Sequence, residues 1–192
     1  ALGSARPNSV DYQDHSGDKQ SHMAILRALT LLALFWTGLA LADDYAAVTQ
    51  LMRAGKLGEA QTLADQYLAN KPRDPQMRFW KGMLLDRQGQ RESALQIYRD
   101  LAQEYPELPE PHNNLGVILA AKGDVEGAKA AFEMAIRTNP SYAIAHENLG
   151  DVLMQLARQS YLQALSLDPK LASASRKLEQ LQPALKLLQG QP

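Results

Sequence analysis

The chain has 192 residues, 45% of them hydrophobic, and a formal net charge of −1. This size suits one modest globular or solenoid domain, and the near-zero charge argues against general nucleic-acid binding, which needs a basic face. The sequence contains no cysteine, which excludes disulfides and thiolate chemistry within it.

Residues 1–22 are polar and show no hydrophobic period. They are predicted to be a disordered leader or a remnant of cloning, because Ser21-His22-Met23 resembles a cloning junction. Either interpretation leaves them outside the fold.

Residues 23–42 have the three parts of a secretory signal peptide. Arg27 gives a short positive start, an apolar run follows from Ala28 to Leu39, and Ala40-Leu41-Ala42 forms a small-x-small cleavage site. The alternative is an uncleaved membrane anchor, but the apolar run is shorter than the ~20 residues of a spanning helix. We therefore expect cleavage after Ala42, export to the periplasm, and no stable membrane insertion of the mature chain.

The mature chain is predicted to begin with a helical unit over residues 43–74. Asp43-Asp44 suits the positive end of a helix dipole, and the first helix is expected to end at Ala54-Gly55. A second helix is predicted from about Leu57 to Asn70, ending before Pro72.

Two more units follow, over residues 75–108 and 109–142. In the latter, Gly116 is small where two helices cross closely, Gly123 supplies the positive φ that ends the first helix, and Phe132 fills the gap between the helices. Apolar residues follow a period of 3.6 throughout, which predicts helices and no strands.

The marker residues of these units recur at a spacing of 34 residues. Those of the third unit are Gly116, Leu119, Gly123, Ala128, Phe132 and Pro140, and those of the second are Gly82, Leu85, Gly89, Ala94, Tyr98 and Pro106. The pattern of leucine-glycine, alanine, aromatic, alanine and proline resembles the tetratricopeptide repeat. The resemblance covers nearly everything after Ala42. It implies an all-α superhelix of antiparallel helix pairs and, with the signal peptide, a bacterial exported protein of this family.

The fourth unit, residues 143–169, departs from the pattern. The motif glycine and the closing proline are 24 residues apart in the pair Gly82 and Pro106, but only 19 apart in Gly150 and Pro169. The missing residues fall between Leu153 and Tyr161, where the turn glycine belongs. We therefore predict one fused helix from about Ile144 to Leu167 in place of a tightened hairpin near Arg158, since no residue there favours positive φ.

A terminal helix is predicted over residues 170–182, with Pro183 ending it and residues 183–192 forming a tail. The fused helix cannot fold its second half back onto its first, so Tyr161 and its apolar neighbours need another cover. The terminal helix could supply it as a cap. A second molecule, forming a homodimer through residues 156–182, is the alternative.

In proteins of this family the first helix of each pair lines a concave groove in which a peptide or partner helix lies. The resemblance and the helical wheel, drawn relative to a buried Gly82, Gly116 and Gly150, give the expected groove residues. They are Tyr45, Thr49, Met52, Arg53, Gln76, Phe79, Met83, Arg87, Asn113, Asn114, Val117, Glu147, Asn148 and Asp151. Apolar surface and arginines mark one end and carboxylates the other, although all could be ordinary solvated side chains. The asparagines are expected to bind neighbouring backbone or an extended ligand, because the lysines of a carboxylate clamp are missing.

His112 and His146 are also 34 residues apart and occupy the place of the motif's first aromatic. A metal pair or an enzyme site is the alternative use, but a His-Glu-x-x-His motif would need histidine where Gly150 stands. We assign no catalytic, cofactor or metal site. The predicted function is a non-catalytic periplasmic adaptor that binds a protein or peptide partner, in cell-envelope assembly or protein quality control. A self-associating structural subunit is the second hypothesis.

Overall fold

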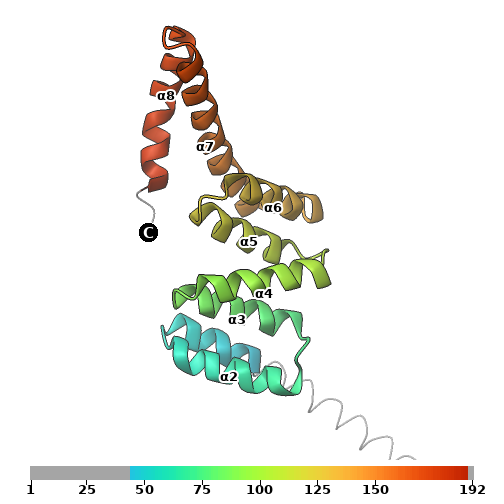
Figure 1. Ribbon diagram of the computed structural model, residues 1–192. Helices are drawn as coiled ribbons and strands as arrows, with labels where there is room; N and C mark the ends of the chain where they lie inside the picture. Colours follow the sequence, from blue (N-terminus) through green and yellow to red (C-terminus); the bar gives the residue numbers. More distant parts are fainter. Residues whose placement is uncertain (1–43, 190–192) are drawn as a thin grey trace, which may run out of the picture. The chain divides into compact units, whose positions relative to one another are not determined.

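The computed structural model describes residues 44–189, and every regular element in that range is a helix (Figure 1). Contacts divide the chain into two compact units, residues 1–47 and 48–192, and the fold described below is that of the second. The predicted leader and signal peptide lie outside the described residues. None of the helices between residues 44 and 189 combines the length and hydropathy that a membrane span requires.

The helices succeed one another with short turns between them. After a helical stretch at residues 44–53 they are α2 (Leu57–Asn70), α3 (Pro75–Arg87), α4 (Arg91–Glu104), α5 (Pro109–Ala121), α6 (Val125–Thr138), α7 (Ala143–Leu167) and α8 (Ala172–Gln189). Each helix from α2 to α8 packs against the next one in the chain. The all-α solenoid of helix pairs predicted from the sequence is confirmed.

The three glycine turns have the backbone conformation that the sequence predicted. Gly55, Gly89 and Gly123 have φ values of 72°, 79° and 82°, a region that side chains with a Cβ avoid. After each glycine, the next amide donates to a carbonyl five residues back, as Asp124 N does to Leu119 O at 2.9 Å. This bond satisfies a carbonyl at the end of the helix and reverses the chain in two residues.

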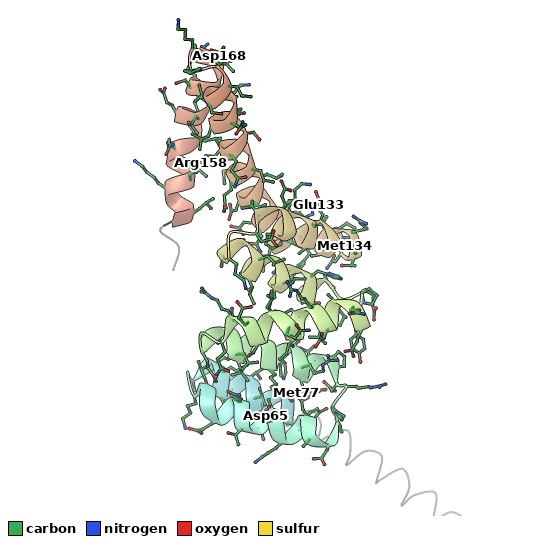
Figure 2. The ribbon with its side chains drawn as sticks, viewed as in Figure 1. Asp65, Met77, Glu133, Met134, Arg158 and Asp168 are labelled. Atoms are coloured by element: carbon green, nitrogen blue, oxygen red, sulfur yellow. The ribbon has the colours of Figure 1, made fainter. Side chains whose placement is uncertain are left out.

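Aspartates and prolines set where several helices begin. Asp74 accepts a hydrogen bond from the Met77 amide at 2.8 Å and precedes Pro75, the first residue of α3. Asp124 does the same for α6, accepting from the Gly127 amide at 3.0 Å. These caps fix the register with which each helix presents its apolar face; Met77, for example, is fully buried (Figure 2).

The pairs α3–α4 and α5–α6 close around a glycine and an aromatic ring. A Cβ added to Gly82 would lie 2.7 Å from the ring of Tyr98, and one added to Gly116 would lie 2.6 Å from the ring of Phe132. Both rings are about 1% exposed and belong to one continuous core. Glycine is therefore required at these two crossings, as the repeat pattern predicted.

Helix α7 confirms the prediction that the fourth pair is fused, since it runs without a break from Ala143 to Leu167. Figure 1 shows it extending beyond α6, with only α8 returning alongside. The expectation that Gly150 is buried is wrong: Gly150 is exposed and nothing lies within 4 Å of a Cβ built on it. No second helix folds back across Gly150, so helix packing does not require a glycine at this position.

Helix α8 supplies the predicted cap, but the predicted end at Pro183 is wrong, because the helix continues to Gln189. Proline removes one backbone hydrogen bond and crowds the preceding turn. Here Pro183 points to solvent, and two residues later Leu185 is buried against α7. Burial of a leucine side chain contributes roughly 2 kcal/mol, which offsets most of the cost of the proline.

Candidate functional site

The predicted groove residues of the second and third units meet in a pocket on one surface of α3 and α5. Met83 and Arg87 of α3 and Asn114 and Val117 of α5 line a cavity of about 120 Å³, together with Asp86 and Tyr98. This pocket and a second one, described next, lie on a surface formed by α3, α5 and the first half of α7. We call this surface the inner face.

A second pocket continues the inner face toward α7. It has a volume of about 150 Å³ and is lined by Val117, Ala120, Phe132, Asn148, Asp151, Val152, Gln155 and Leu188. Val117 borders both pockets and is 43% exposed. The two pockets therefore adjoin at Val117, and the surface where they meet is apolar.

Three asparagines and one tyrosine form a hydrogen-bonded row along the inner face. Asn148 donates to Asn113 Oδ1 at 2.9 Å, Asn113 donates to Asn114 Oδ1 at 3.2 Å, and Asn114 donates to the Tyr98 hydroxyl at 3.2 Å. Of the two predicted uses of Asn114 and Asn148, hydrogen bonding to neighbouring backbone is not the one found, because their amides donate to the side chains of Tyr98 and Asn113; binding of an extended ligand stays a prediction. Asn113 is 4% exposed, whereas Asn114 and Asn148 are half-buried and border the pockets.

Opposite charges lie at the two ends of this row. The Arg87 guanidinium is exposed and reaches the Met52 carbonyl at 3.5 Å. At the other end Asp151 is half-buried, one helical turn after the exposed Glu147. Burial, and then the charge of Glu147, raise the pKa of Asp151. A cation placed beside Asp151 would relieve both effects.

A third pocket lies where α3 and α5 begin. It has a volume of about 220 Å³ and is lined by Pro75, Gln76, Phe79, Leu108, Glu110 and Pro111. The Phe79 ring is half-buried and lies 5.7 Å from the Tyr98 ring, centroid to centroid. Phe79 is thus both a pocket residue and a part of the core's edge.

The groove residues predicted in the first repeat, residues 43–74, do not line these pockets. Met52 is 6% exposed and belongs to the core, Thr49 is half-buried and Arg53 is exposed. Asp86 occupies the equivalent position one repeat later and is only half-buried. Met52 is more buried than Asp86 because its side chain is apolar and packs on the core. Tyr45 belongs to the other unit of the chain.

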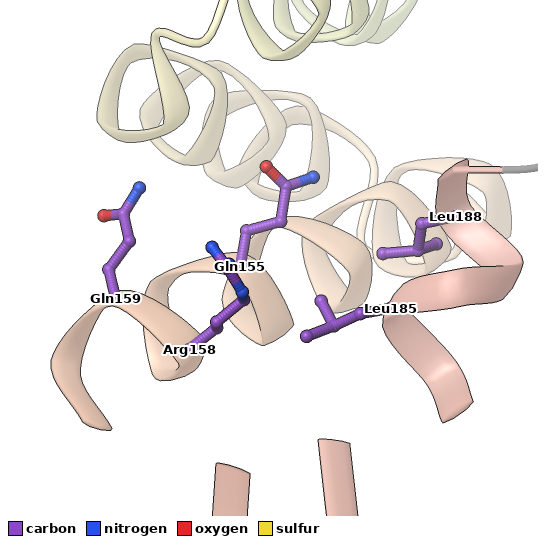
Figure 3. Close-up of a pocket in the computed structure, with 5 residues that line it drawn as sticks. All are labelled: Gln155, Arg158, Gln159, Leu185 and Leu188. Atoms are coloured by element: carbon purple, nitrogen blue, oxygen red, sulfur yellow. The ribbon is translucent and has the colours of Figure 1, made fainter. Parts of the chain in front are cut away.

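Several residues that line the inner pockets were not predicted, among them Tyr98, Phe132, Val152, Gln155 and Leu188. Tyr98 and Phe132 were assigned wholly to the core, yet their ring edges reach the pockets. Leu188 was missed because the predicted tail began at Pro183, and Gln155 was missed because the predicted groove residues ended at Asp151. They also line a polar pocket of about 280 Å³ between α7 and α8, with Arg158, Gln159 and Leu185 (Figure 3).

The two repeat-related histidines have the same structural role. His112 Nε2 lies 3.1 Å from the Pro106 carbonyl and His146 Nε2 lies 2.9 Å from the Pro140 carbonyl. Each ring therefore ties the start of a first helix to the proline that closes the preceding pair. Between residues 44 and 189, no three His, Cys, Asp or Glu side chains gather where they could hold a metal ion.

Comparison with known proteins gives matches of two kinds. Two family models, both described as tetratricopeptide repeat, match residues 45–109 and 85–150. A probable biofilm formation methyltransferase, WspC of Pseudomonas putida, is 35% identical over 92 residues, which are 48% of this chain and 22% of the relative. The chain thus spans about a fifth of that relative's length.

Solved structures share the arrangement of the helices. The crystal structure of TTC0263, a thermophilic protein of this repeat type from Thermus thermophilus, superposes with a TM-score of 0.56 at 26% identity, over 74% of this chain and 81% of that one. PcrH of Pseudomonas aeruginosa, in complex with the chaperone binding region of PopD, superposes with a TM-score of 0.54 at 23% identity, over 60% and 92% of the two chains.

Proposed function

Because the chain belongs to the tetratricopeptide-repeat family, we propose that it is a non-catalytic adaptor that binds an extended segment of a partner protein on its inner face. The observation that carries the proposal is the pair of pockets that share Val117. PcrH, which has this fold, was crystallised in complex with the chaperone binding region of PopD, and this supports a segment of a protein as the kind of ligand.

The lining predicts the chemistry of the bound segment. An apolar side chain of the segment would rest on Val117 and Met83, which removes exposed apolar surface from water. An acidic group suits the end at Arg87, and a basic one suits the end at Asp151 and Glu147. Asn114 and Asn148 offer the amide groups that an extended backbone, with its unpaired N–H and C=O groups, requires.

The two histidines are assigned a structural role and not that of ligands or acid–base groups. The Nε2 atoms of His112 and His146 face the carbonyls of Pro106 and Pro140 at hydrogen-bond distance. Binding a metal ion through these atoms would break a bond that joins two helix pairs.

We place the adaptor in the periplasm, in cell-envelope assembly or protein quality control, on the basis of the signal peptide predicted over residues 23–42. Mass spectrometry of the protein purified from its native host tests this placement. The expected mature N-terminus is Asp43. An intact segment before Asp43 in protein from the cell envelope would contradict cleavage, and recovery in the cytoplasm would contradict export.

The binding site is tested by a photocrosslinking side chain introduced at Val117 in the native host. We expect it to capture one partner, and Val117→Glu to abolish the complex while the helical content stays unchanged, because Val117 is already 43% exposed. The matched control is Ala130, which is exposed on α6 away from the pockets. Equal capture from Val117 and Ala130, or a partner that still binds the Val117→Glu chain, would refute the inner face as the site.

A further inference from the structure

The pockets of the inner face continue into the space between α7 and α8. Gln155 and Leu188 line both the pocket of about 150 Å³ on the inner face and the pocket of about 280 Å³ between α7 and α8, which Figure 3 shows. Val117 joins the two pockets of the inner face in the same way. Three adjoining pockets therefore follow one another from α3 to the last turns of α8.

The wall that α8 contributes to the third of these pockets exists because the helix continues past Pro183. Leu185 is buried against α7, and Leu188, about one turn later, is half-buried at the edge that two pockets share. A helix that ended at Pro183 would leave this side of α7 without its apolar wall. The last turns of α8 thus lengthen the surface on which an extended segment can lie.

The wall that α7 contributes is polar and carries two opposite charges. Asp151, Gln155 and Arg158 follow one another at intervals of four and three residues, which places them on one face of the helix. Asp151 lines the pocket on the inner face, Arg158 lines the pocket beside α8, and Gln155 lines both. Asp151 and Arg158 are seven residues apart, a distance of about 10 Å along the helix axis.

Arg158 has donors that no carboxylate of residues 44–189 occupies. Two cations that lie between helices are paired, since Arg78 bonds Glu104 at 2.7 Å and Lys81 bonds Asp65 at 2.6 Å. Arg158 is part of no such pair within the described range; it is exposed and lines its pocket beside two glutamines. Its planar guanidinium carries five N–H donors, whose fork matches the two oxygens of a carboxylate.

We propose that the partner segment extends from the inner face into the pocket between α7 and α8, where Arg158 binds an acidic side chain of that segment. The inference rests on the proposed function and specifies its ligand further. A basic residue beside Asp151 and an acidic residue at Arg158 would lie about 10 Å apart, which an extended chain spans with about three residues. The amides of Gln155 and Gln159 are available to the backbone of the segment between them.

The test is the selection of binding peptides from a phage-displayed library of random sequences on the immobilised full chain. We expect the selected peptides to carry a basic and an acidic residue about three positions apart. Selection on Arg158→Glu should enrich a basic residue in place of the acidic one, because the charge of the pocket is reversed. The matched control is Arg176→Glu, the same change of charge at an exposed position of α8 that lines none of these pockets. It should select the same peptides as the unmodified chain.

The affinity of a selected peptide, made synthetically, measures the contact. Arg158→Gln should weaken binding about fivefold. It should add no loss for a peptide whose acidic residue is replaced by glutamine, because both changes remove the same contact. The helical content should stay unchanged, since Arg158 is exposed and glutamine favours a helix.

Val117→Glu separates this proposal from the proposed function. It should abolish binding of every selected peptide, because Val117 lies where the two pockets of the inner face adjoin. Peptides that depend on Val117 but carry no acidic residue, or that bind Arg158→Gln as tightly as the unmodified chain, would overturn the role of Arg158 and leave the inner face as the site. A selection that yields no peptide, or only peptides that still bind the Val117→Glu chain, would overturn both.

Discussion

The Tyr98 hydroxyl accepts a hydrogen bond from the Asn114 side chain across 3.2 Å, and this contact joins the core of the α3–α4 pair to the inner face on α5. Tyr98 is 1% exposed. Burial raises its pKa from 10.0 to about 12, while the bond from Asn114 acts in the opposite direction. The neutral phenol is therefore the form that the fold stabilises.

This pKa predicts a stability loss at high pH. Because the pKa of Tyr98 is higher in the folded than in the unfolded chain, the stabilisation is fully present below the unfolded value of 10.0 and is lost as the pH rises toward about 12. Between these limits the unmodified chain should lose about 3 kcal/mol more than Tyr98→Phe. Urea unfolding of both proteins at each pH measures the difference, and equal losses would contradict the prediction.

The crossing of α5 and α6 predicts the effect of the smallest added side chain. A Cβ at Gly116 lies 2.6 Å from the Phe132 ring, which is buried and cannot move aside, so Gly116→Ala should cost about 1–3 kcal/mol despite its better helix propensity. Adding Phe132→Leu should recover part of that loss, because the smaller side chain removes the clash. Denaturation of the two single variants and the double variant tests this coupling, and strictly additive losses would refute it.

Asp74 is predicted to stabilise the fold more than an ordinary helix-capping residue does. It accepts from the Met77 amide at 2.8 Å and from the Tyr67 hydroxyl at 3.2 Å, so Asp74→Ala removes the cap of α3 and a bond to α2 together. We expect a loss of about 2 kcal/mol in the free energy of unfolding. The control is Asp124→Ala, which removes only a cap and should cost about 1 kcal/mol. A smaller loss at Asp74 than at Asp124 would contradict this ranking.

The proline inside α8 predicts a stabilising substitution. Pro183→Ala should restore the missing backbone hydrogen bond and relieve the crowding, which raises the free energy of unfolding by about 1–3 kcal/mol. Hydrogen exchange should show the amide of Leu185 protected in the unmodified chain and more so in the variant. Free exchange at Leu185 in the unmodified chain would mean that the helix ends at Pro183 after all. Gln182→Ala, next to it and exposed, is the control for propensity alone.

The fold could be predicted in detail wherever a residue type is forced by local geometry. Gly55, Gly89 and Gly123 each need positive φ, and a chain that lacks such a glycine between Leu153 and Tyr161 continues as a helix. The end of α8 could not be predicted this way. Proline is unfavourable inside a helix when judged from local sequence, but here the burial of Leu185 against α7 decides the outcome.

The candidate site was predictable in part for the same reason. Met83, Arg87, Val117 and Asp151 follow from the helical wheel of the repeat, Asn114 and Asn148 follow from the family resemblance, and all six line the inner pockets. Met52 satisfies the same wheel but lies in the core, because the wheel gives the direction of a side chain and not its apolar contacts. The bond from Asn148 to Asn113 joins residues 35 apart, a distance in sequence that no local pattern describes.

The continuous backbone of α7 also has a consequence for the order in which the chain unfolds. In a stacked array each helix pair contacts only its neighbours, so a terminal pair ordinarily frays by itself. Here Ala145 and Val152 anchor the first half of α7 in the core, while the second half carries the hairpin with α8. Because the two halves share one unbroken run of hydrogen bonds, separating them means breaking a helix in its middle. The C-terminal hairpin and the third repeat therefore melt as one cooperative block.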